Sequence, residues 1–178
     1  MIHRPTAGGL ARRTPSDETP LPRASSQSAL TPSHWLALAH PSPARAHGEW
    51  RTHRVAMLPL GQRFDTVRIP AAVLYAALHD VRPAAVSPLL EQVLDGPVIQ
   101  DAERWFYPLV PVSGAVRWQS RAATYVGEGW LGVPEIHQVP PPGAYWVVPM
   151  REPGHLCDQT RVAELVAVGS ARLSGASS

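Results

Sequence analysis

The chain has 178 residues and a formal net charge of +2, and all 16 of its basic residues are arginine. At about 100–200 residues per domain, this length allows one domain and excludes a large multidomain enzyme. The 20 prolines and 13 glycines disfavour long uninterrupted helices.

Cysteine content and hydropathy restrict the compartment. A single cysteine, Cys157, cannot form an internal disulfide, which excludes a secreted disulfide scaffold. The longest apolar run, Ala71–Leu78, is far shorter than the ~20 residues that span a bilayer. Residues 1–30 contain no apolar stretch of signal-peptide length. We therefore expect a cytoplasmic protein with no membrane partner.

Charge and composition divide the chain into three parts. Residues 1–29 are rich in Pro, Ser, Thr and Arg, and they predict a disordered basic arm. Residues 30–169 contain 11 arginines and 12 acidic residues and predict a single, nearly neutral domain. Residues 170–178 predict a disordered tail. The basic excess therefore belongs to the ends of the chain, and within the body only residues 45–68 are locally basic.

The first predicted elements are a helix and two strands. Thr31 as N-cap and Pro32 at the first helical position predict a short helix as far as Ala39, with Trp35 and Leu38 facing inward. Residues 54–60 read as an apolar strand, and Gly61 begins a turn into a strand over 63–69. Both faces of this second strand are mixed in polarity, which favours a place beside a groove over one in the core.

The middle of the chain predicts two helices and a hairpin. Pro70 precedes a helix over 71–80, and Ser87 caps a helix that ends before Gly96. Residues 97–100 and 105–110 form a predicted β-hairpin, in which Pro108 indicates an edge strand or a bulge.

The last third begins with a long connection over residues 111–135. Short strands are expected near 124–126 and 135–139, then a polyproline turn over 140–143 and a strand over 144–149. Asp158 caps a final helix to Val168, which Gly169 ends in the left-handed conformation. This mixed order predicts an α+β fold: a mostly antiparallel sheet with helices packed on it.

Other side chains suggest chemistry only weakly. The spacing of His34, His40, His47 and His53 does not match known zinc sites. Cys157, with His155 nearby, is either a nucleophile whose pKa a helix N-terminus lowers or an ordinary loop thiol. Four tryptophans lie in the strand-rich half, and we expect one of them to be a surface platform on which bases stack; they are Trp105, Trp118, Trp130 and Trp146.

Three blocks resemble small actinobacterial primase/polymerase-like proteins, which are related to the N-terminal domain of bifunctional DNA primase/polymerases. The blocks are residues 64–70 ahead of a helix, residues 96–111, and residues 139–149. Together the resemblance covers about half of the chain. It implies an RRM-like catalytic fold in which clustered acids and a histidine hold Mg or Mn ions and the nucleotide phosphates.

The chain departs from this pattern at the acids. Asp65 occupies the first acidic position, but Val67 replaces the second acid, and Arg104 and Trp105 lie where the histidine is expected. Glu128 and Glu135 are alternative candidates for the third acid. One carboxylate cannot hold a metal pair, so Asp65 is only a weak catalytic candidate and the domain is expected to be degenerate.

The leading hypothesis is a non-catalytic protein, with no cofactor, that binds DNA or a replication or regulatory protein for an actinobacterial chromosome or mobile element. Six arginines are the candidate phosphate contacts: Arg54, Arg63, Arg68, Arg104, Arg117 and Arg121. The alternatives are an active primase/polymerase that uses Mg or Mn, and a protein-interaction module without a nucleic-acid role.

Overall fold

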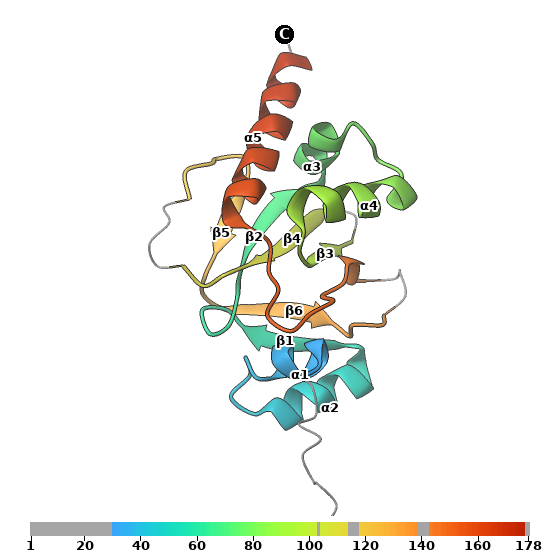
Figure 1. Cartoon of the computed structure of the whole chain (residues 1–178), viewed down its shortest axis with the longest axis vertical. Coiled ribbons are helices and arrows are strands. Elements are labelled where there is room, and N and C mark those ends of the chain that lie inside the picture. The colour runs from blue at the N-terminus through green and yellow to red at the C-terminus, as the bar shows by residue number, and fades with distance from the viewer. Residues whose placement is uncertain (1–29, 103, 114–117, 139–142, 177–178) are drawn as a thin grey trace, which may run out of the picture.

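A computed structural model describes residues 30–102, 104–113, 118–138 and 143–176. In Figure 1, helices α3 (Ala71–Leu78), α4 (Pro83–Leu94) and α5 (Gln159–Ala176) lie above a sheet. Below that sheet lie the ribbon of β1 (Val55–Pro59) and β6 (Trp130–Pro134) and then helices α1 (Pro32–Ala37) and α2 (Pro43–His53). The predicted α+β class is confirmed.

The main sheet has five antiparallel strands in the order β5-β2-β4-β3-β7. They are β5 (Thr124–Val126), β2 (Asp65–Pro70), β4 (Trp105–Val110), β3 (Val98–Asp101) and β7 (Tyr145–Val148). The predicted hairpin is β3 and β4. The strand expected over 135–139 is wrong: it occurs earlier, as β6, because residues 130–134 pair with β1.

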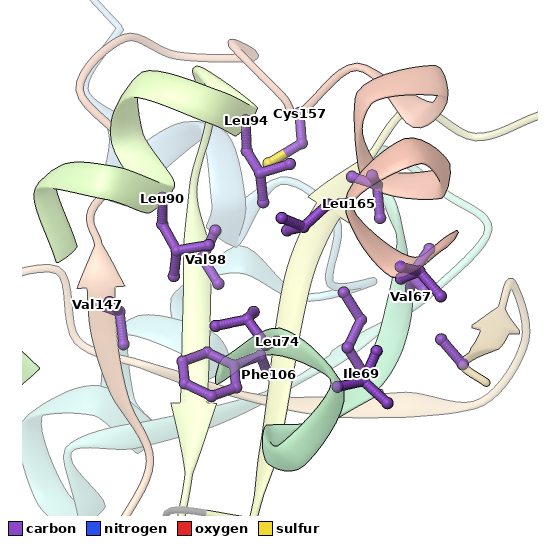
Figure 2. Close-up of a cluster of buried hydrophobic side chains, with 14 of the residues drawn as sticks. Val67, Ile69, Leu74, Leu90, Leu94, Val98, Phe106, Val147, Cys157 and Leu165 are labelled. Carbon is purple, nitrogen blue, oxygen red and sulfur yellow. The ribbon is translucent and has the colours of Figure 1, made fainter. Parts of the chain in front are cut away.

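One face of the five-stranded sheet packs against α3, α4 and α5. Val67, Ile69, Val98 and Phe106 from the strands meet Leu74, Leu90, Leu94 and Leu165 from the helices, and all are buried. Figure 2 shows these side chains pointing into one cluster between the helices and the strands. This face is therefore closed to ligands.

A second core lies between the other sheet face and the N-terminal elements. Leu36, Ala37, Ala46 and Trp50 of α1 and α2 pack with β1, β6 and the inner strands. Thr31 caps α1 as predicted, because its side chain accepts a hydrogen bond from the His34 backbone N–H. Trp35 packs against this core as predicted, with its ring centroid 6.4 Å from that of the buried Phe64. Leu36 and Ala37 are fully buried, whereas Leu38, which was predicted to face inward, is only half-buried.

Helix α2 was not predicted, although Ser42 and Pro43 form the same start signal as Thr31 and Pro32. Its Glu49 accepts a hydrogen bond from the Met57 backbone N–H at 3.0 Å. A side chain of α2 thus covers an edge group of β1, where an open strand would otherwise invite pairing. The locally basic stretch 45–68 is consequently divided between a helix, a ribbon strand and the sheet.

Two strands are more central than predicted. β2 pairs with β4 on one side and with β5 on the other, and of residues 65–69 only Arg68 is exposed. Pro108 lies in β4, which has neighbours on both sides, so its expected place on an edge or bulge is wrong. The Thr66 hydroxyl donates to the Pro108 carbonyl at 2.9 Å and supplies a hydrogen bond at this position.

Helix boundaries also differ from the prediction. α4 begins at Pro83, before the predicted cap Ser87, and contains Pro88 in its interior. α5 begins after Asp158 as predicted, but it continues through Gly169 to Ala176. The predicted end at Gly169 is wrong, and so is disorder over 170–176, because Gly169 packs against α3 within the helix. In the described parts of the chain, no helix has the length and apolar character to cross a membrane.

Candidate nucleic-acid interface

The face of the five-stranded sheet opposite α3–α5 carries one row of side chains across all five strands. Strand pairing sets Thr124 beside Arg68, and Tyr107 beside Ile99, which pairs with Trp146. The register that pairs Ile69 with Phe106 sets Arg68 opposite Tyr107. Because side chains alternate along each strand, this row lies on the face away from α3–α5, where Ile99 and Trp146 are buried in the second core and Tyr107 packs against it.

Beside the second core, Arg68 lies with the rings of Trp105 and Tyr107 from β4 and of Trp130 from the ribbon strand β6. The Arg68 guanidinium carbon lies 4.7 Å from the centroid of the Trp105 ring, within the range of a cation–π contact. Tyr107 and Trp130 line the same groove as Arg68, and the groove encloses about 380 Å³. At 54 % exposure, Trp130 confirms that a tryptophan of this half lies at the surface.

Three polar side chains of the groove take no part in the ion pairs and hydrogen bonds among the described residues. Among the described residues, neither the Arg68 guanidinium nor the Asp101 carboxylate forms an ion pair, and the Tyr107 hydroxyl forms no hydrogen bond. Burial raises the pKa of Tyr107, the charge of Asp101 raises it further, and the charge of Arg68 opposes the change. The charges of Asp101 and Arg68 therefore both reach the Tyr107 hydroxyl.

Of the other five candidate arginines, two lie at the Arg68 end of the sheet, two lie elsewhere, and one is outside the described residues. Arg104 in the β3–β4 turn and Arg121 before β5 are exposed, and the strand register sets both at the end of the sheet where Arg68 lies. At the other end of β2, Arg63 lies over the Trp35 ring at 5.7 Å. Arg54 is paired with Glu135. Arg117 lies outside the described residues.

Asp65 begins β2 and is 3 % exposed. Its Oδ1 accepts a hydrogen bond from the Gly61 backbone N–H at 2.8 Å, and its Oδ2 accepts one from the Tyr125 hydroxyl. Burial, together with this bond, raises the pKa of Tyr125 to about 12. Both carboxylate oxygens thus join the β1–β2 turn to β5, which is an anchoring arrangement.

The two candidate third acids lie in different places. Glu128 lines a shallow cavity of about 520 Å³ together with Asp65. Glu135 follows β6 and pairs with Arg54 instead. Within the described ranges, no three His, Cys, Asp or Glu side chains gather in a group that could hold a metal ion. A polymerase metal pair would need more carboxylates than Asp65 and Glu128 supply.

Cys157 lies in the closed core and not at a reactive surface. Its side chain is fully buried and points into the cluster around Leu94, as Figure 2 shows. Burial raises the pKa of the thiol to about 12, which is the opposite of the lowering considered for a nucleophile. The sulfur lies 3.4 Å from the Pro97 carbonyl oxygen, so Cys157 is a packing residue.

Sequence reasoning identified Arg68 and the tryptophans but missed Tyr107 and Asp101. Tyr107 offered a signal, because it alternates with core residues along the predicted strand 105–110, whereas Asp101 fell in the predicted turn. The strand order that brings both beside Arg68 could not be read from the sequence. Comparisons with family models, with curated proteins and with solved structures find no match for this chain.

Proposed function

We propose that this protein binds single-stranded nucleic acid in the groove between its five-stranded sheet and the β1–β6 ribbon, without catalysing a reaction. The observation that carries the proposal is the Arg68 guanidinium, which lies over the Trp105 ring and lines one groove together with Tyr107 and Trp130. Bases of single strands stack on aromatic rings and on guanidinium planes. The resemblance of the sequence to primase/polymerase-like proteins is in keeping with such a ligand.

The charges of the groove agree with this ligand. Arg68 makes no ion pair among the described residues, so its charge is available to a phosphate. Arg104 and Arg121 are exposed at the same end of the sheet and extend the positive charge along the path of a strand. The groove volume of about 380 Å³ also falls in the range of about 300–1,000 Å³ found for small-ligand pockets.

The test is a titration of fluorescently labelled oligothymidine of ~10 nucleotides, followed by anisotropy at ~50 mM salt and at higher salt. Trp130→Ala removes a stacking ring worth about 1–3 kcal/mol, so affinity falls about 5- to 150-fold. Arg68→Ala weakens binding and reduces the salt slope by about 1.

Arg161→Ala on α5 is the matched control, because this exposed arginine lies on the helix layer and not in the groove. It keeps the wild-type affinity within about twofold if the groove is the site. Equal losses in all three variants would mean that only general charge matters. No binding by the wild type would remove the nucleic-acid function and favour the protein-interaction alternative.

A further inference from the structure

Asp101 lies at the end of β3, inside the groove that contains Arg68 and Tyr107. It pairs directly with Trp105 across β3 and β4, and Ile99, two residues earlier, pairs with Tyr107. Side chains of directly opposed residues are about 4.5–5.5 Å apart at Cβ, and diagonal neighbours remain within reach of aromatic rings. The carboxylate therefore lies beside the two rings closest to Arg68.

The position of this carboxylate is unusual for a surface that binds an anionic polymer. It repels phosphate, and nothing among the described residues neutralises it by an ion pair or hydrogen bond. It is also not on the solvent rim, since it is half-buried and its charge raises the pKa of Tyr107. A half-buried acceptor between stacking groups is suited to hydrogen-bond donors on the edge of a base.

We infer that Asp101 selects guanine at one position of the bound single strand. Guanine alone presents two adjacent donors on its Watson–Crick edge, the N1–H and one N2–H, and these match the two oxygens of a carboxylate. Such paired, charge-assisted bonds are the stronger and more directional kind. A base that enters the groove beside Arg68 and Tyr107 meets Asp101 in the same groove.

The same carboxylate disfavours the other bases. Adenine and cytosine each offer one exocyclic N–H₂ donor beside a ring-nitrogen acceptor, which repels a carboxylate oxygen. Thymine and uracil offer one ring N–H between two carbonyl acceptors. Each of them leaves one Asp101 oxygen facing an acceptor, so the preference comes from repulsion as well as from attraction.

This inference rests on the proposed function, and the experiment separates the two. The probes are labelled nine-residue oligonucleotides of thymidine in which the central residue is guanine, inosine, adenine or thymine. Inosine keeps the N1–H but lacks the N2 amino group. For the wild type we expect the guanine probe to bind at least about fivefold more tightly than the adenine and thymine probes, with inosine between them.

Asp101→Asn is the test variant, because an amide replaces one acceptor with a donor and keeps the shape. We expect it to bind the guanine and thymine probes within about twofold of each other. Glu164→Gln, the same charge change at an exposed site on α5, is the control and keeps the guanine preference.

Three results have distinct meanings. If all four probes bind the wild type equally, or if Asp101→Asn keeps the guanine preference, the role of Asp101 is refuted while the proposed function stands. If no probe binds, the proposed function fails and the inference fails with it. Guanine preference that disappears only in Asp101→Asn supports both.

Discussion

The role of Asp65 can be decided by stability measurements, because anchoring and catalysis predict opposite results. Asp65 accepts hydrogen bonds from the Gly61 backbone N–H and from the Tyr125 hydroxyl while it is almost fully buried. A hydrogen bond to a charged group contributes about 1.5–3 kcal/mol. Removing the carboxylate by Asp65→Ala breaks both bonds, but it also relieves the cost of burying a charge.

The net loss for Asp65→Ala is therefore about 2–3 kcal/mol in the free energy of unfolding. For a chain of this length, such a loss lowers Tm by about 4–12 °C. Asp65→Asn keeps an acceptor for Gly61 and can donate to the Tyr125 oxygen, so it costs about 1 kcal/mol. The measurement is urea unfolding followed by tryptophan fluorescence, with thermal unfolding by circular dichroism.

Tyr125→Phe completes a double-mutant cycle. Tyr125 donates to Asp65, so the double variant loses less stability than the sum of the two single variants, by about 1 kcal/mol. A carboxylate held for catalysis at a cost to the fold behaves differently, because its removal relieves strain or repulsion. If Asp65→Ala is as stable as the wild type or more stable, the anchoring argument is refuted.

Two further predictions concern the helix layer. Gly169→Ala lowers the free energy of unfolding by about 1–3 kcal/mol, measured by thermal unfolding, because a Cβ there lies 2.0 Å from the Val73 carbonyl oxygen of α3. Gly175→Ala is the control: a Cβ there has nothing within 4 Å, so this change stabilises α5 by up to about 1 kcal/mol. Equal effects of the two variants would contradict the close packing of α5 on α3. The thiol of Cys157 resists iodoacetamide at pH 8 until the protein unfolds. Rapid labelling of the native protein would instead show that the thiol is accessible. Because burial raises the pKa of the Cys157 thiol from 9.0 to about 12, the contribution of this thiol to stability is complete below pH 9 and declines between pH 9 and 12.

Local sequence signals determined most of the helix starts and the central hairpin. Thr31 with Pro32, Pro70 and Asp158 act on backbone groups within one turn, so their effect does not depend on the rest of the chain. Residues 97–110 form a hairpin because neighbouring segments pair through a short turn. The α+β class followed from the order of these elements.

Tertiary structure alone decided which strands are neighbours, and several residues therefore have a structural role that differs from the predicted one. Gly169 is a helix-ending signal by sequence, but close contact with α3 requires a glycine inside α5. Pro108 lies in a central strand, where the Thr66 hydroxyl donates to its carbonyl. Asp65 accepts a hydrogen bond from Tyr125, a residue 60 positions away, and no signal in the sequence predicts this partner.

The candidate site shows the same division. The sequence predicted Arg68 as a candidate phosphate contact and one of four tryptophans as a surface stacking platform, by residue type alone. It could not bring Arg68 beside Tyr107, or Asp101 beside Trp105, because alternation along a strand determines only the face of a side chain and not its neighbours. The neighbours of a side chain are set by pairing between strands that are distant in the sequence. This pairing depends on how the two cores pack against the two faces of the sheet.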